Sequence, residues 1–373
     1  MLRELIAFDT TSSKPNRPAA DYLDTYLVKH GCTTARFESD SGRKVNLLVR
    51  KGPDVDGGLM LCGHLDVVPA DEPEWSSNPF DLVESGDRLV ARGAADMKGF
   101  VALASQMLAD ADADALRVPL YGLFTHDEEI GTVGAARFAE QWDGRWRLPS
   151  ACIVGEPTEL RVVRMHKGHL RLRVSVRGVA AHSGYPQLGS NAIVKLGTVI
   201  NALYDLSQEL EAERCATSAH FPETPYVVLN QGQVAGGVAV NIVPDLCTLE
   251  VGVRILPGQQ SFEYIDRVRE AVRGLPDVGD DVSVDVVSDS PPLHTAEDAE
   301  VNQRLCRQIG QKETVAVSYA SDAGPLAVMG VECVLFGPGS ISVAHRPNEF
   351  LPRTQLEAAG ETLAELVNAW CAG

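Results

Sequence analysis

The sequence of 373 residues is poor in basic side chains and contains no long apolar run. Lys and Arg number 33 against 51 Asp and Glu, and the resulting net charge of −18 argues against nucleic acid or an anionic membrane surface as a partner. No apolar stretch approaches the ~20 residues needed to cross a bilayer. The segment Met1–Asp9 also lacks the apolar core of a signal peptide. These absences predict a cytoplasmic protein.

Closely spaced cysteine pairs are missing as well. The eight cysteines never form a Cys-x-x-Cys pair, the spacing on which many structural zinc sites are built. They are therefore expected to be reduced and mostly buried. The remaining composition is that of a globular protein, with 45% apolar and 23% charged residues. Because the chain exceeds what one hydrophobic core usually organises, two domains are expected.

Strand-like and helix-like segments alternate at both ends of the chain. Short apolar runs predict buried strands at 44–49, 58–62, 118–125, 151–155 and 333–336. Helices are predicted at 97–109, 133–142, 299–310 and 352–372. This alternation is typical of an α/β fold with a largely parallel sheet.

The pattern changes between residues 166 and 288. Leu170–Arg177 alternates apolar and polar side chains, which predicts a strand with one solvent-exposed face. Further strands are predicted at 226–234, 246–255 and 282–287, with helices at 190–213 and 261–272. We therefore predict an α+β domain at 166–288, inserted between the two parts of a discontinuous α/β domain at 1–165 and 289–373.

Side chains that bind metals or transfer protons follow the predicted α/β strands. His64 and Asp66 are two residues apart on an extended segment and so point to the same side. One of them can bind a metal while the other orients the imidazole. The alternative is a surface loop with incidental polar residues.

Four further segments carry ligand-type residues, each with an ordinary alternative. Asp96 can bridge two metals or merely cap a helix. Within Asp127–Glu129, one carboxylate can bind a metal and another can act as general base, or the run can be an acidic loop. Glu156 can be a ligand or a solvated strand end, and His345 a ligand or a loop residue.

The combination favours a metal site over these alternatives. Two histidines with several carboxylates and no thiolate form an oxygen-rich set that suits paired zinc, cobalt or manganese ions. Paired ions lower the pKa of a bridging water and polarise a carbonyl, as amide hydrolysis requires.

These segments resemble a known family of metallopeptidases. Gly63–Pro69, Gly93–Gly99, Asp127–Gly131 and Gly155–Thr158 occur in the order and spacing of the family that holds acetylornithine deacetylase, succinyl-diaminopimelate desuccinylase, aminoacylase and glutamate carboxypeptidase. The resemblance implies a zinc-hydrolase catalytic domain at 1–165 and 289–373. It also implies that the inserted domain serves as a lid and dimerises.

The resemblance also implies the metal ligands. His64 and Glu156 are expected on one ion, Glu129 and His345 on the other, and Asp96 between them. The expected cofactors are two divalent ions per subunit, Zn²⁺ with Co²⁺ as the alternative.

Further roles rest on the resemblance alone. Asp66 is expected to orient the ligand before it, and the family pattern selects Glu128 as the general base. His182, within Gly178–Gly184, matches the histidine that hydrogen-bonds the developing oxyanion, and in dimeric relatives it reaches the partner's zinc site. Asn241 and Arg254 match the stretch that receives the substrate carboxylate; without the family, Arg254 is an ordinary strand residue.

Within the family, three segments resemble the acetylornithine deacetylase group: Glu156–Leu160, Met165–His169 and Gly337–Ile341. The resemblance implies hydrolysis of N2-acetyl-L-ornithine to L-ornithine and acetate, in arginine biosynthesis, by a homodimer. Ser321–Ala323 departs from the Thr-Glu-Ala common in bacterial deacetylases. The alternatives are the desuccinylase, a broad-specificity aminoacylase and, in another class, a non-catalytic binding protein on the same fold.

Overall fold

The computed structural model describes all residues, 1–373, and the chain divides into two compact units. The first unit comprises Met1–Met165, Leu293–Ala316 and Ser321–Gly373. The second comprises His166–Pro292 and Val317–Ala320. The second unit begins at the residue where the insertion is predicted to begin, and it ends four residues after the predicted 288. None of the helices has the length and apolar composition of a membrane-spanning helix.

A mixed nine-stranded sheet forms the centre of the first unit, in the order β1-β2-β6-β3-β7-β15-β8-β13, with β14 paired to β8. The strands are β1 (Thr33–Glu38), β2 (Val45–Lys51), β3 (Leu59–His64), β6 (Leu120–Thr125), β7 (Ala151–Val154), β8 (Val163–His166), β13 (Leu293–His294), β14 (Val315–Val317) and β15 (Glu332–Leu335). The α/β class is confirmed. Parallel pairing is limited to the central strands β6, β3, β7 and β15, while β1, β2 and β8 pair antiparallel.

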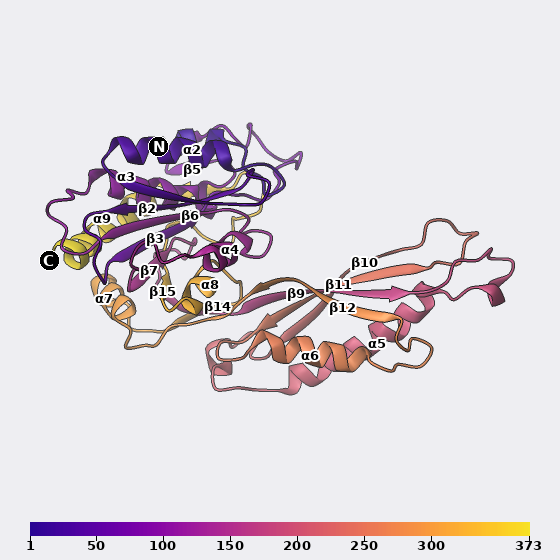
Figure 1. Cartoon of the computed structure of the whole chain (residues 1–373). Coiled ribbons are helices and arrows are strands. Elements are labelled where there is room, and N and C mark those ends of the chain that lie inside the picture. Colours follow the sequence, from indigo (N-terminus) through magenta and orange to yellow (C-terminus); the bar gives the residue numbers. More distant parts are fainter. The chain divides into compact units, whose positions relative to one another are not determined.

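Helices cover both faces of this sheet (Figure 1). One face is covered by α2 (Arg17–Lys29), α3 (Gly99–Asp110), α7 (Glu300–Ile309) and α9 (Arg353–Val367), and the other by α4 (Val133–Gln141) and α8 (Ala323–Val328). Helix α1 (Leu2–Ala7) packs beside α3, and β4 (Val83–Ser85), β5 (Arg88–Val90) and β16 (Phe350–Pro352) form a small second sheet. Every residue of β3, β6 and β7 is buried, because strands between two helical layers have no solvent-exposed face.

Helix α3 begins two residues later than predicted. Residues Ala94–Lys98 form a separate turn, in which the backbones of Asp96 and Met97 are not helical. The turn removes Asp96 from the helix, and its side chain makes no capping hydrogen bond there. The carboxylate is consequently directed toward the ends of the strands.

The second unit is a four-stranded antiparallel sheet in the order β10-β11-β9-β12. Its strands are β9 (Gly168–Arg177), β10 (Val228–Gly236), β11 (Leu246–Ile255) and β12 (Val282–Ser290). Helices α5 (Ala192–Ala212) and α6 (Ser261–Val272) both lie on one face (Figure 1). Alternate residues of β9 and β11 are buried beneath these helices, so the period-two pattern in the sequence has a direct structural cause.

Candidate metal centre

Three neighbouring parallel strands deliver the polar residues of the site. His64 is the last residue of β3, Glu156 comes two residues after β7, and Glu128–Glu129 follows the end of β6. Because β6, β3 and β7 are adjacent and parallel, their carboxyl ends meet at one edge of the sheet. The alternation of strands and polar ends in the sequence thus produces one site.

Two clusters of potential ligands share a single carboxylate. In the first, His64 Nε2 lies 3.1 Å from Asp96 Oδ1, and Glu156 completes a group whose ligand atoms lie within 4.8 Å of one another. In the second, His345 Nε2 lies 3.3 Å from Asp96 Oδ2 and 2.9 Å from Glu129 Oε2. Each oxygen of Asp96 therefore faces a different cluster, as a bridge between two ions requires.

The residues fit a pair of divalent ions. Glu156 Oε1 is buried and has no hydrogen-bond partner, which is costly for a carboxylate unless a cation binds it. The donors are imidazole nitrogens and carboxylate oxygens without thiolate, a set that binds zinc-like ions in catalytic sites. Both clusters thus have the donor type and the spacing for one ion each.

The crowded carboxylates change one another's protonation. Burial raises the pKa of Glu156 well above its usual value, and the nearby charge of Asp96 adds to this. Burial and the charge of Asp96 likewise raise the pKa of Glu129 to about 7. Hydrogen bonds to Asp96 and Glu129 raise the pKa of His345 to about 10. Protons therefore occupy, in the metal-free protein, positions for which metal ions compete.

We expect the metal-free protein to lose stability as the pH rises. A carboxyl whose pKa is raised by folding stabilises the protein fully below its unfolded value, 4.5 for Glu129, and this contribution is lost as the pH rises through about 7. The raised pKa of His345 acts in the same direction up to about pH 10. The loss from Glu129 is on the order of 3 kcal/mol.

Thermal unfolding from pH 5 to 9, with chelator and with added Zn²⁺, measures this effect. The metal-induced rise in Tm should grow with pH, because bound cations compensate the same charges. A metal-free Tm that stays constant or rises over this range would contradict the expectation.

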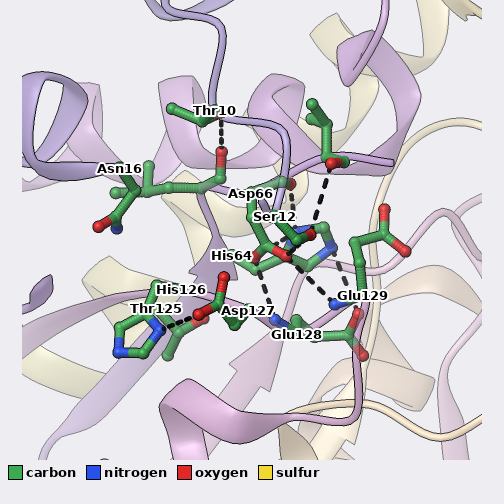
Figure 2. A network of polar contacts seen from close by, with 12 residues as sticks. Thr10, Ser12, Asn16, His64, Asp66, Thr125, His126, Asp127, Glu128 and Glu129 are labelled. Carbon is green, nitrogen blue, oxygen red and sulfur yellow. Dashed lines mark hydrogen bonds and ion pairs between the residues drawn. The ribbon is translucent and has the colours of Figure 1, made fainter. Parts of the chain in front are cut away.

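Asp66 holds the segment that carries the two glutamates (Figure 2). Its Oδ1 accepts the backbone N–H of Glu128 at 3.0 Å, and its Oδ2 accepts that of Glu129 at 3.3 Å and the hydroxyl of Ser12 at 2.7 Å. The imidazole of His64 is instead oriented by the backbone carbonyl of Asp66, 2.9 Å from Nδ1, while the carboxylate lies 3.7 Å away. The carboxylate predicted to orient His64 thus makes its hydrogen bonds to Ser12 and the glutamate segment.

Of the three consecutive acids, Asp127 is directed away from the clusters. Its carboxylate lies 3.1 Å from His126 Nδ1 (Figure 2). The same carboxylate pairs with Lys44. Glu128 belongs to neither cluster, yet its Oε2 lies 4.0 Å from His64 Nε2. Burial raises the pKa of Glu128 well above its usual value, with the charges of Glu156 and other acids adding to this. Glu128 is therefore a carboxylate beside the two clusters that belongs to neither of them.

The second unit holds the other predicted site residues at two separate places. His182 is exposed and lies in the segment that follows β9. Asn241 lies close to it, because its backbone carbonyl accepts a hydrogen bond from the N–H of Ser183, the residue after His182. Arg254 lies near the other end of the sheet, where it pairs with His169 of β9. Leu246, at the end of β11 nearest His182, is eight residues from Arg254, or about 27 Å along the strand.

Sequence analysis missed several polar residues around the centre, among them the partly buried Ser12 and Lys44 and the buried Arg92 and Glu349. No spacing rule marks them, because their partners are distant in the sequence. The only signal was position: Arg92 directly precedes Gly93–Gly99, and Glu349 follows His345 within the same short run.

Paired ligand clusters that share a carboxylate at the strand ends of an α/β unit define a metal-dependent hydrolase, and comparisons with known proteins agree. Residues 60–369 match the peptidase family M20/M25/M40, and the chain belongs to this family. It is 37% identical to an acetylornithine deacetylase of Myxococcus xanthus over 100% of this chain and 97% of that protein. It is 32% identical to an acetylornithine deacetylase of Pasteurella multocida over 100% of this chain and 98% of that protein.

Solved structures show the same fold. A metallo-carboxypeptidase of the M20 family from Sulfolobus solfataricus superposes with a TM-score of 0.74 at 19% identity, covering 99% of this chain and 98% of that one. A dinuclear metal-binding peptidase of the M20 family from Bacillus subtilis gives a TM-score of 0.66 at 15% identity, covering 98% and 95%. Family membership and the intact ligand clusters make the chain an enzyme, and the non-catalytic alternative is set aside.

Proposed function

We propose that the chain is a zinc-dependent acetylornithine deacetylase that hydrolyses N2-acetyl-L-ornithine to L-ornithine and acetate in arginine biosynthesis, in the cytoplasm. The observation that carries the reaction type is Asp96, shared by both ligand clusters with Glu128 beside them. The choice of substrate is supported by the relatives of that name, which match the whole chain. Cobalt is the alternative metal.

Different residues of the first unit are proposed to bind the metal ions and to transfer protons. His64, Asp96 and Glu156 would hold one ion, and Asp96, Glu129 and His345 would hold the other. Two such ions activate a water and polarise the acyl carbonyl. Glu128 takes the proton of the attacking water and passes it to the leaving amine. Asp66 keeps Glu128 in place through the backbone hydrogen bond.

The second unit is proposed to bind the substrate and the developing oxyanion. His182 donates a hydrogen bond to the oxyanion, while Asn241 and Arg254 receive the substrate carboxylate, which a guanidinium can bind with two parallel hydrogen bonds. His182 and Arg254 lie at opposite ends of one sheet, farther apart than the length of an acyl amino acid. This separation supports a site to which one subunit contributes Arg254 and another contributes His182, with Asn241 beside it.

A homodimer accounts for the exposed surface of the second unit. Strand β10 is at the edge of its sheet, with Val234 58% exposed, and Val238 beyond its end is 85% exposed. Val194, in the first turn of α5, is 70% exposed. An apolar strand edge is normally paired or covered. If this edge pairs with the same edge of a second copy across a twofold axis, the exposed strand edges of both copies are covered.

Hydrolysis rates measured side by side test the proposed substrate. We expect the highest kcat/KM for N-acetyl-ornithine among N-acetyl-ornithine, N-succinyl-diaminopimelate, N-acetyl-methionine and N-acetyl-citrulline. A pocket shaped for acetyl rejects succinyl, because the additional carboxylate is buried without a partner. The net charge of −18 also suits the cationic ornithine side chain. A higher kcat/KM for the succinyl substrate overturns the proposal, and similar rates on all acetylated substrates indicate an aminoacylase.

A further inference from the structure

Glu349 is a buried carboxylate that lies four residues after His345, and only 1% of it is exposed. Its Oε1 accepts the backbone N–H groups of Ala95 at 2.9 Å and Asp96 at 3.1 Å. Its Oε2 accepts the backbone N–H of Gly93 at 3.1 Å and pairs with Arg92 at 2.9 Å. The three hydrogen bonds from backbone N–H groups hold the turn that presents Asp96.

Arg92 extends the same network to two other segments. Its side chain is 1% exposed and stacks on the ring of Trp75. Besides Glu349, the guanidinium donates to the carbonyl of Arg346 at 3.3 Å and to that of Pro69 at 3.1 Å. Arg346 is next to His345, and Pro69 lies five residues after His64. One buried ion pair thus joins the three segments that carry His64, Asp96 and His345.

The two ligand clusters differ in how much they depend on this pair. His64 ends a fully buried strand, and Glu156 lies two residues after another, so hydrogen bonds of the sheet fix both. The His345 side chain is 50% exposed and lies in a loop outside the sheets, with a left-handed backbone at His345 (φ 61°) and Asn348 (φ 58°). The position of His345 relative to Asp96 is therefore set by contacts of this loop. The buried ion pair Arg92–Glu349 is the contact that connects the loop of His345 with the turn of Asp96.

We propose that Arg92 and Glu349 are positioning residues that set the separation of Asp96 and His345, and thereby the affinity of the second metal position, formed by Asp96, Glu129 and His345. The inference rests on the proposed two-metal centre. Outer contacts of this kind typically change metal affinity by about 10- to 100-fold. Two of the three ligands of the first position, His64 and Glu156, keep their support from the sheet, so this position depends less on the pair.

Glu349→Gln tests the proposal with a change of few atoms. Both carboxylate oxygens accept N–H groups, so the new amide nitrogen must face a donor on one side or the other. Chelator-treated protein is titrated with Co²⁺ alone, and the visible absorption of the bound ion is followed. We expect the first equivalent to bind within about 3-fold of wild type and the second to bind about 10- to 100-fold more weakly.

Two other variants make the result specific. Glu357→Gln removes a charge from an exposed residue of α9 and should bind both equivalents like wild type. Arg92→Lys keeps the charge but replaces a planar group by a single ammonium, which cannot reach Glu349, Pro69 and Arg346 together. Arg92→Lys should also weaken the binding of the second Co²⁺ equivalent. It replaces Glu349→Gln in the experiment if that variant does not fold.

The possible outcomes are distinct. If Glu349→Gln and Arg92→Lys fold and bind both equivalents like wild type, the pair does not position the ligands. Equal weakening of both equivalents indicates a general structural role and also overturns the inference. Wild-type protein that binds fewer than two Co²⁺ ions overturns the two-metal centre itself, before the variants are compared.

Discussion

Glu128→Gln is expected to lower kcat by about 10²- to 10⁴-fold while leaving the metal content unchanged. Glu128 lies beside the first cluster, with Oε2 4.0 Å from His64 Nε2, but belongs to neither ligand group. Glutamine keeps the shape of the side chain and removes its ability to take up and release a proton. Turnover of the acetylated substrate and elemental analysis of zinc measure the two effects separately.

Glu129→Gln is the matched control, one residue away in the same turn. Its Oε2 lies 2.9 Å from His345 Nε2, within the second cluster, so its replacement should deplete about one ion of two. Loss of metal in Glu128→Gln together with its retention in Glu129→Gln would show that the two roles are exchanged.

An equal mixture of inactive Glu128→Gln and inactive His182→Ala proteins is expected to regain about a quarter of wild-type activity after subunit exchange. Random exchange makes half of the dimers mixed. If His182 acts across the proposed homodimer, each mixed dimer contains one complete site, in which an intact Glu128 is combined with an intact His182 of the other subunit. Loss of the oxyanion donor alone typically costs about 10²- to 10³-fold in kcat, so the recovery is measured against a low background.

A second mixture controls for effects of exchange itself. Glu128→Gln mixed with Glu129→Gln should show no recovery, because both changes damage the first unit and no mixed dimer has an intact site. Exchange is verified independently with differently tagged subunits. If exchange is complete and the His182→Ala mixture still shows no activity, each subunit uses its own His182.

The location of the site was predictable because strand ends are visible in sequence. The apolar runs that end at His64 and before Glu156 are buried strands, and strands of this kind bring their carboxyl ends together. The orientation of Asp127, which is directed away from the ligand clusters, was not predictable from the residues alone. It depends on Lys44, which is distant in sequence and pairs with Asp127.

The fold was predictable to a similar degree. The alternation at Leu170–Arg177 predicted a strand with one exposed face, and β9 has this burial pattern because helices cover one face of its sheet. Two features depended on tertiary contacts that no local pattern encodes. The turn at Ala94–Lys98 interrupts a helix-like run, and Val317–Ala320 joins the second unit from far along the chain.

The hydrogen bonds of Asp66 have a mechanical consequence. One side chain accepts the N–H groups of two adjacent residues for which different roles are proposed, Glu128 and Glu129. The backbone of one glutamate therefore cannot shift relative to Asp66 without straining the hydrogen bond of the other. The end of β3 thereby sets the backbone position of both glutamates at once.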